Sequence, residues 1–275
     1  RRGADRRGQD ELIDPDVALT LMTQAVREAG DVALTYGARG AKVFRKTDAS
    51  PVTEADLAVD TLLRESLLAV QAGIGWLSEE TVDDPLRLSC RQVWIVDPID
   101  GTRGFMAGNG EWVISAALIE DGAPIASTVL RPTTGDLYHA TRGGGAFRNG
   151  RRIQCSDGSL AEARSAAGPK PYVDLVRQHV AALDHRPRLA SLALRLTETA
   201  EGDIDIAFAK PLSHEWDTAA AALLLQEAGG ALTSFCGEPV IYNRPDPSHP
   251  PLVAAGERRR RDFARLFGAM PPPQI

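Results

Sequence analysis

The sequence lacks the long apolar runs and the paired cysteines that would place it in several large classes of protein. No segment reaches the ~18 consecutive apolar residues of a membrane-spanning helix, and no basic start leads into an apolar stretch with a cleavage site for secretion. The three cysteines, Cys90, Cys155 and Cys236, are too few and too far apart for a zinc site or a disulfide framework. We therefore expect no membrane contact and a reducing, cytoplasmic location.

Positive charge is also in deficit. The chain has 31 Lys and Arg against 37 Asp and Glu, a formal net charge of −6. This balance argues against a protein that binds a nucleic-acid polymer, which normally presents a basic face, but it allows a small anionic ligand held through metal ions. With 43% apolar residues among 275, the chain can bury a sizeable core. Residues 1–10 show no hydrophobic periodicity, so we take them as a flexible extension.

Hydrophobic spacing divides the rest of the chain into two halves. Residues 11–155 begin with an amphipathic helix at Asp16–Tyr36 and a second helix, and continue as a β-meander whose hairpins are marked by Asp121-Gly122 and Asn149-Gly150. In residues 156–275, short strands alternate with helices, which indicates an α/β unit. We expect an α/β protein, with an α+β half followed by an α/β half.

Several acidic residues share one property: each lies at the end of a predicted strand or in the first turn of a predicted helix. They are Asp56, Glu79, Glu80, Asp97, Asp100 and Asp217. Strand ends are where α/β proteins place ligand-binding groups, and Mg²⁺ prefers carboxylate oxygens. A cluster of Glu79, Asp97, Asp100 and Asp217 would suit two or more such ions, and the Ile99 carbonyl would add another oxygen.

Each of these residues also has a plain structural interpretation. Asp-Pro-x-Asp-Gly at 97–101 is a turn sequence in its own right. Thr53-x-x-Asp56 has the spacing of a capping box, Asp217 stands where an N-cap residue would, and Glu79-Glu80 would be solvated charge in a loop. For each residue alone the structural interpretation is preferred, and only the combination indicates function.

The combination resembles the lithium-sensitive phosphatases of the inositol-monophosphatase superfamily, over about Asp16 to Phe267. Four motifs carry the resemblance, in the order expected of the superfamily. They are Ser50-Pro51-Val52-Thr53-x-x-Asp56, Leu77-Ser78-Glu79-Glu80, Trp94-Ile95-Val96-Asp97-Pro98-Ile99-Asp100-Gly101-Thr102, and Trp216-Asp217 through Glu227-Ala228-Gly229-Gly230. Gly143–Gly150 is similar to a further segment. The resemblance implies a layered α-β-α-β-α sandwich, with a metal-binding half over 11–155 and a substrate-binding half over 156–275.

The resemblance also implies a mechanism. It implies two Mg²⁺ ions, or three with a weaker one near Glu79, and inhibition by Li⁺. The implied metal ligands are Glu79, Asp97, the Ile99 carbonyl, Asp100 and Asp217. The implied catalytic residues are Glu79 together with Asp56 and Thr102, which would orient the attacking water. If Gly101-Thr102 open a helix, their N–H groups would contact phosphate oxygens.

The leaving group is indicated by weaker positions. Lys210 stands where inositol monophosphatases carry a polyol-binding Glu, and Arg195 where they often have Asp. Basic groups suit a second phosphate, and Arg103-Gly104-Phe105 and Trp216–Ala220 are similar to bisphosphate nucleotidases, the latter to the CysQ type. The hypothesis is hydrolysis of the 3′-phosphate of 3′-phosphoadenosine 5′-phosphate to AMP. The implied substrate contacts are Asp100, Gly101, Thr102, Ser191, Arg195, Lys210 and Asp217.

Other interpretations stay open. Lys210 and Arg195 would equally be solvated surface charges, and Ala190-Ser191 replaces a Gly-Ser pair of the superfamily. The alternatives are an inositol-1-phosphate phosphatase or a promiscuous sugar-phosphate phosphatase and, in a different class, a non-catalytic metal- or nucleotide-binding relative. The run Arg258–Arg261 would contact nucleic acid or, as we prefer, form the solvated face of a helix. Analogy with inositol monophosphatases suggests a homodimer.

Overall fold

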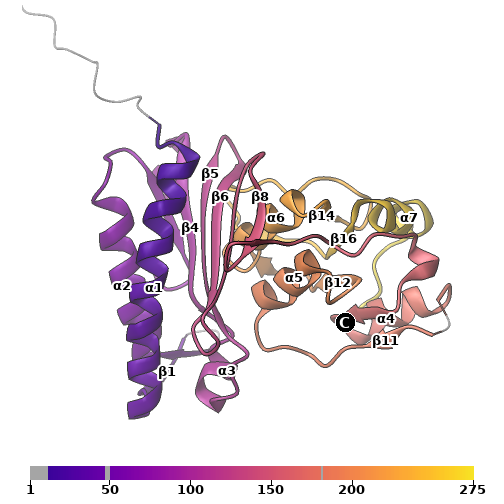
Figure 1. Cartoon of the computed structure of the whole chain (residues 1–275), viewed down its shortest axis with the longest axis horizontal. Helices are drawn as coiled ribbons and strands as arrows, with labels where there is room; N and C mark the ends of the chain where they lie inside the picture. The colour runs from indigo at the N-terminus through magenta and orange to yellow at the C-terminus, as the bar shows by residue number, and fades with distance from the viewer. Residues whose placement is uncertain (1–11, 47–49, 181) are drawn as a thin grey trace, which may run out of the picture.

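Helices and sheets alternate in five layers (Figure 1). The computed structural model describes residues 12–46, 50–180 and 182–275, so the extension expected over residues 1–10 lies outside the described residues. Outermost on one side are α1 (Pro15–Arg39) and α2 (Glu54–Leu68), which pack on a seven-stranded sheet. α5 (Leu192–Glu201) and α6 (Ala219–Glu227) lie between this sheet and a five-stranded one. The α-β-α-β-α sandwich expected from the sequence is confirmed.

The seven-stranded sheet carries the predicted meander. Its order is β3-β4-β5-β6-β7-β8-β9, with a parallel first pair and antiparallel neighbours thereafter. Its strands are β3 (Gly75–Ser78), β4 (Gln92–Asp100), β5 (Val113–Glu120), β6 (Ala123–Arg131), β7 (Asp136–Thr141), β8 (Gly145–Arg148) and β9 (Arg151–Arg152). Asp121-Gly122, with φ of 48° and 82°, and Asn149-Gly150, with 48° and 78°, form the hairpin turns. Both central residues are left-handed, as a two-residue turn of this kind requires.

The five-stranded sheet is mixed rather than parallel. Its order is β11-β10-β12-β16-β14, and β16 is antiparallel to both neighbours. Its strands are β10 (Ser165–Ala167), β11 (Asp184–His185), β12 (Ile206–Ala209), β14 (Gly230–Ser234) and β16 (Leu252–Gly256). The alternation of helices and strands in this half is as expected, but the αβ connections do not produce an all-parallel sheet.

The five-stranded sheet is buried on both faces, because it lies between the middle hydrophobic core and the outermost one. In β12, Ile206 and Phe208 face the outermost core, whereas Ala207 and Ala209 face the middle one. This period of two is what strand geometry imposes on alternate residues. The outermost core is closed by α4 (Lys170–Arg177) and α7 (Glu257–Phe267).

The remaining elements are short. They are β1 (Val43–Arg45), β2 (Pro51–Thr53), η1 (Pro85–Ser89), α3 (Thr102–Ala107), η2 (Leu160–Glu162), β13 (Ser213–His214) and β15 (Ser248–His249). The first sheet ends at Arg152 and the second begins at Ser165. Because the middle core draws side chains from both, the assignment of separate roles to residues 11–155 and 156–275 stays a prediction. Among the described residues, none of the helices has the length and apolar content needed to cross a membrane.

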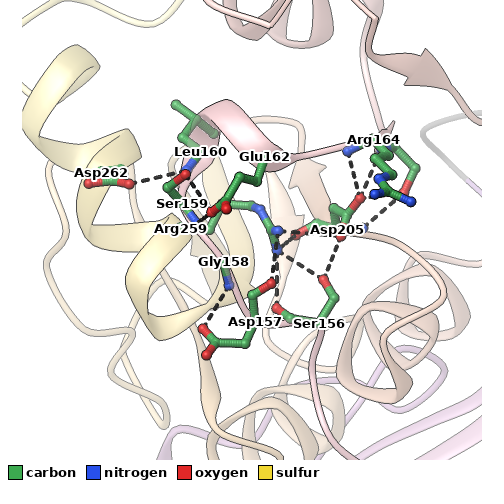
Figure 2. A network of polar contacts seen from close by, with 11 residues as sticks. Ser156, Asp157, Gly158, Ser159, Leu160, Glu162, Arg164, Asp205, Arg259 and Asp262 are labelled. Atoms are coloured by element: carbon green, nitrogen blue, oxygen red, sulfur yellow. Dashed lines mark hydrogen bonds and ion pairs between the residues drawn. The ribbon is translucent and has the colours of Figure 1, made fainter.

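One side chain of the basic run at 258–261 is buried, contrary to the solvated helix face that the sequence suggested. Arg259 is 1% exposed, and its Nη1 donates to the Ser156 carbonyl at 3.1 Å and to the Ser156 hydroxyl at 2.9 Å (Figure 2). Its Nη2 lies 3.5 Å from Asp205 Oδ1. We call Ser156, Asp157, Asp205 and Arg259 the Arg259 clasp. It fastens α7 to the segments before β10 and β12, so Arg259 is not available to nucleic acid.

Candidate active site

The site is built around the end of β4, where the strand reaches the first helix turn of α3. β4 continues through Asp97 to Asp100, and its pairing with β5 is irregular between these two residues. The sequence suggested that Asp97 ends the strand, but Asp97 lies within it. Gly101 follows with a φ of 95°, and a Cβ there would lie 2.6 Å from the Glu111 carbonyl oxygen. Only glycine fits this turn, and α3 begins at Thr102 with Gly101 as its N-cap, so the helix start that the sequence left as a condition is present.

Three carboxylates converge at this turn. Asp97, Asp100 and Asp217 each offer an oxygen within 4.8 Å of the others. At this separation two carboxylates repel by about 3.5 kcal/mol for an effective dielectric constant of about 20. Asp97 is 1% exposed and neither of its carboxylate oxygens has a hydrogen-bond partner. A buried carboxylate without a donor is costly, so this donor set calls for protons or cations.

The pKa values of the three carboxylates reflect the same burial and mutual repulsion. Burial, followed by the charges of Glu79, Asp100 and Asp217, raises the pKa of Asp97 well above its usual range. Burial likewise raises the pKa of Asp100 to about 6, although hydrogen bonds from Ser191 and Ala193 oppose the change. Burial and the charge of Asp100 raise the pKa of Asp217. All three shifts favour loss of the negative charge, which a divalent cation would reverse.

Ser191 was expected to contact the substrate, but its hydroxyl contacts Asp100 and the start of α5 instead. It is fully buried, and its Oγ donates to Asp100 Oδ2 at 2.7 Å while accepting the Leu194 N–H at 2.9 Å as the N-cap of α5. The Ala193 N–H donates to the same Asp100 oxygen at 2.5 Å. Since its hydroxyl is committed on both sides, Ser191 orients Asp100 and does not face the ligand. Asp100 is thus held by the start of α5.

Asp217 does not cap a helix. α6 begins two residues later, at Ala219, with Thr218 as its N-cap. Asp217 instead accepts the His214 N–H at 2.7 Å through Oδ2. The interpretation of Asp217 as an ordinary N-cap residue is therefore wrong, and its other oxygen remains free for the cluster.

Asp56 serves two purposes through different oxygens. Its Oδ2 accepts the Thr53 N–H at 2.8 Å and the Thr53 hydroxyl at 2.5 Å, which completes the predicted capping box. Its Oδ1 lies 3.3 Å from the Thr102 hydroxyl, which is also 3.3 Å from the Ile99 carbonyl. Burial raises the pKa of Asp56. The structure thus brings together Asp56, Thr102 and the Ile99 carbonyl, as the sequence predicted.

Glu79 lies beside the cluster but is not one of its three members. Its Oε1 is 2.9 Å from the Lys46 Nζ, which is also 2.9 Å from Glu80. Its charge still raises the pKa of Asp97, Asp100 and Asp217. Sequence reasoning missed Lys46, because a lone lysine in the loop before Ser50 has no motif of its own.

Asp60 is the second residue that sequence reasoning missed. It lies one helical turn after Asp56 and accepts the Ser78 hydroxyl at 2.5 Å and the Thr81 hydroxyl at 2.6 Å. These two hydroxyls bracket Glu79 in the chain, so Asp60 holds both ends of the segment that carries it. The i, i+4 spacing of two acids on one helix is the signal that could have indicated it.

A pocket of about 760 Å³ opens beside the cluster, within the size range of small-molecule sites. Asp100 and Asp217 line it, and so do the predicted substrate contacts Arg195 and Lys210. Arg195 is only 7% exposed, so its interpretation as a surface charge is wrong, whereas Lys210 is exposed at the mouth. Gly101, Thr102 and Ser191 are not among the residues that line the pocket. Loop residues 185–190 form much of its wall.

Comparison with known proteins agrees with this arrangement. A model of the Inositol monophosphatase family matches residues 14–264. The chain belongs to this family. It is therefore a phosphatase of the inositol monophosphatase superfamily, whose members hydrolyse small phosphate esters and depend on Mg²⁺.

The family's relatives differ in substrate. The 3′(2′),5′-bisphosphate nucleotidase CysQ of Aggregatibacter actinomycetemcomitans is 32% identical, covering 89% of this chain and 94% of its own. The inositol-1-monophosphatase of Rhizobium meliloti is 34% identical (80% and 86%), and the histidinol-phosphatase of Mycobacterium tuberculosis 36% identical (74% and 81%). Among solved structures, the extragenic suppressor protein suhB of Bartonella henselae is similar, with a TM-score of 0.77 at 27% identity over 91% of this chain and 98% of that one. Relatives with three different activities are each about one third identical to this chain, so sequence identity does not determine the substrate. The residues that line the pocket have to indicate it.

Proposed function

We propose that this protein is a Mg²⁺-dependent phosphomonoesterase that hydrolyses the 3′-phosphate of 3′-phosphoadenosine 5′-phosphate to AMP and phosphate. The observation that carries the reaction type is the buried, unpartnered carboxylate of Asp97 between Asp100 and Asp217. Such a donor set fits a hard divalent cation, which takes oxygen ligands from a few carboxylates, carbonyls and waters. Asp97, Asp100, Asp217 and the Ile99 carbonyl would hold the metal, with Glu79 joining them once Lys46 releases it.

The chain's own residues supply the positioning. Bound Mg²⁺ would neutralise the carboxylates, polarise a phosphoryl oxygen and lower the pKa of water. Asp56 accepts the Thr102 hydroxyl through Oδ1, while its other oxygen is fixed by the capping box. This pair is therefore rigid, and it would orient the attacking water and take up its proton at Asp56. Fixed orientation of this kind lowers the entropic part of the barrier.

The residues that line the pocket support this choice of leaving group. The hydroxyl groups of a polyol such as inositol both donate and accept hydrogen bonds, whereas charged Lys210 and Arg195 can only donate and leave the hydroxyl donors unmatched. A nucleotide with a second phosphate suits these donors better. The inositol-1-monophosphatase relative keeps inositol 1-phosphate as the alternative substrate.

Replacement of one cluster residue tests the reaction type. Asp97→Asn should lower Mg²⁺-dependent phosphate release more than about 100-fold, since loss of an outer partner of a metal ligand alone typically costs 10–100-fold. It should also abolish the rise in melting temperature on addition of Mg²⁺. Asp31→Asn, at an exposed position of α1, is the matched control and should change neither. Full activity of Asp97→Asn would contradict the proposal.

A substrate panel tests the leaving group. The wild-type protein with Mg²⁺ should release phosphate from 3′-phosphoadenosine 5′-phosphate faster than from inositol 1-phosphate or fructose 1,6-bisphosphate. Preference for inositol 1-phosphate would overturn the choice of substrate and leave the role of the carboxylates untouched.

A further inference from the structure

Most of the charged side chains that line the pocket beside the carboxylates are basic. These basic residues come from α4, from β11 and the loop that follows it, from α5, and from the position directly after β12. They are Lys170, His185, Arg186, Arg188, Arg195 and Lys210. Among the described residues, the acidic side chains that line the pocket are Asp100 and Asp217, which belong to the carboxylate cluster. A ligand in this pocket therefore meets both carboxylates and basic side chains.

Arg195 is the deepest of these basic groups. It is 7% exposed, and its Nε has no hydrogen-bond partner. Among the described residues, no hydrogen bond or ion pair neutralises its guanidinium, although the charges of Asp100 and Asp217 act on it at longer range. Burial lowers the pKa of Arg195 to about 10, so it is still charged at neutral pH. A buried cation without a close partner is costly unless an anion joins it.

Arg188 lies close to Arg195 and adds to the same positive field. Its charge is among the causes that lower the pKa of Arg195, after burial and against the opposing effect of Asp100. Arg188 is exposed in the loop before α5, and it too forms no hydrogen bond or ion pair within the described part of the chain. Two arginines that repel each other and lack a close acid are the arrangement that a phosphate would complete.

Another basic side chain at this pocket has a close partner of its own, since Lys170 is bound to Asp174 one turn along α4. Arg186 acts on Glu198 only at longer range, as Asp100 and Asp217 act on Arg195. Arg195 is nevertheless distinguished by its burial, and Arg188 is the basic residue whose charge acts on it.

We propose that Arg188 and Arg195 form a second anion-binding subsite, which selects substrates that carry a second phosphate on the leaving group. The first phosphate would lie against the carboxylate cluster and the second against these two arginines. The inference deepens the proposed function and rests on it for the position of the scissile phosphate. It adds Arg188, which no motif indicated, and it makes charge rather than the adenine ring the basis of selection.

The subsite would also discriminate between the substrates of the related enzymes. Inositol 1-phosphate carries only hydroxyl groups at its far end and would leave both arginines without a counter-charge. Histidinol phosphate carries an amine that is cationic at neutral pH, and this end would be repelled by Arg188 and Arg195. A bisphosphorylated substrate is the class that suits both the metal site and the two arginines.

Two substrates that differ only in the second phosphate isolate the effect. Adenosine 3′,5′-bisphosphate and adenosine 3′-monophosphate share the scissile 3′-phosphate and the nucleoside. With saturating Mg²⁺, kcat/KM of the wild-type protein should be about 100-fold higher for the bisphosphate, because a charge-assisted hydrogen bond typically contributes ~10-fold or more. Arg188→Gln should lower kcat/KM for the bisphosphate about 10-fold and leave that for the monophosphate unchanged.

The controls separate charge at the subsite from charge in general. Arg151→Gln, at an exposed position of β9 remote from the pocket lining, should leave both substrates unchanged. Because Arg188 is exposed, its replacement does not threaten the core, whereas replacement of the buried Arg195 alone would leave misfolding as an explanation. Equal losses on both substrates, or no loss on either, would overturn the subsite.

A binding experiment without Mg²⁺ keeps the two proposals apart. AMP carries only the 5′-phosphate, so calorimetry on the metal-free protein reports the second subsite alone. Wild-type protein should bind AMP about 10-fold more tightly than Arg188→Gln does, and adenosine should not discriminate between them. If the wild type hydrolyses neither 3′-phosphate but Arg188→Gln weakens AMP binding, the proposed function fails and the subsite stands. Equal AMP affinities would overturn the subsite whatever the hydrolysis shows.

Discussion

Two regions of this molecule bury charge, and they differ in whether that charge has partners. In the Arg259 clasp, the arginine donates to Ser156 and pairs with Asp205, and Asp205 in turn accepts from the Ser156 hydroxyl at 2.6 Å and the Arg164 N–H at 2.8 Å (Figure 2). At the pocket, Arg195 has no such partner and Asp97 accepts no hydrogen bond at all. Two buried arginines thus differ in whether the chain gives them partners.

The pKa values of Asp97 and Asp205 differ in the same way. Although burial opposes it, hydrogen bonds such as that from Ser156 hold the pKa of Asp205 below its usual value. Burial and neighbouring carboxylates raise the pKa of Asp97. A structural charge is satisfied within the chain, whereas a charge that the chain leaves unsatisfied at a pocket awaits a ligand. The difference teaches that partners, and not burial, distinguish the two kinds of site.

The largest expected effect comes from exchanging the two buried arginines for methionine. Arg259→Met should lower the free energy of unfolding by about 3–4 kcal/mol, because it breaks the ion pair with Asp205 and removes a donor from the Ser156 carbonyl. Its kcat/KM at a temperature where it is folded should match the wild type. Chemical denaturation and a phosphatase assay measure the two quantities.

The matched variant Arg195→Met should behave in the opposite way. Its free energy of unfolding should change by less than about 1 kcal/mol, because the desolvation of an unbonded arginine offsets its attraction to Asp100 and Asp217. Its kcat/KM for a bisphosphorylated substrate should fall. A destabilised Arg195→Met with full activity would break the comparison, since Arg195 would then be a structural arginine.

A smaller effect is expected from pH and Mg²⁺. Asp97, Asp100 and Asp217 have raised pKa values in the folded metal-free protein, whereas aspartate titrates near 4 when unfolded. Their contribution to stability is therefore full below pH ~4 and is lost as pH rises through the folded pKa, about 6 for Asp100. Between pH 5 and 7.5, Asp97→Asn should reduce this loss of stability, because the amide does not titrate.

Mg²⁺ gives the complementary measurement. Because protons compete with the cation for the same oxygens, the stabilisation by a fixed Mg²⁺ concentration should be larger at pH 7.5 than at pH 5. Thermal unfolding with and without Mg²⁺ at the two pH values measures it. The opposite trend would mean that the cluster is not the principal Mg²⁺ site.

Much of the fold could be predicted because local signals agree with it. The Asp121-Gly122 turn and the alternation of Ile206, Ala207 and Phe208 indicate hairpins and strands without help from distant residues. The antiparallel direction of β16 could not be predicted, since strand direction within a sheet depends on packing between segments far apart in sequence. For the same reason, the burial of Arg259 in a basic helical run could not be read from charge pattern.

The candidate site divides in the same way. Asp97, Asp100 and Asp217 lie in motifs and were predicted, whereas Ser191 was assigned to the ligand and instead holds Asp100. Arg188 has no local signal, because its significance comes only from its proximity to Arg195 across the pocket wall. Residues whose role depends on a neighbour in space are those that sequence reasoning misses.

Asp60 tests this comparison further. Both of its carboxylate oxygens accept hydrogen bonds, as those of Asp205 in the Arg259 clasp do, yet Asp60 lies beside the candidate active site. It accepts the Ser78 and Thr81 hydroxyls on either side of Glu79. Asp60→Ala should weaken Mg²⁺ activation about 10-fold, as loss of an outer partner of a metal ligand does, and leave kcat at saturating Mg²⁺ little changed. Titration of activity with Mg²⁺ separates the two effects, and Glu65→Ala, exposed on the same helix, is the control. If Asp60→Ala lowers only the free energy of unfolding, its hydrogen bonds belong with those of Asp205, and a saturated carboxylate beside an active site is structural after all.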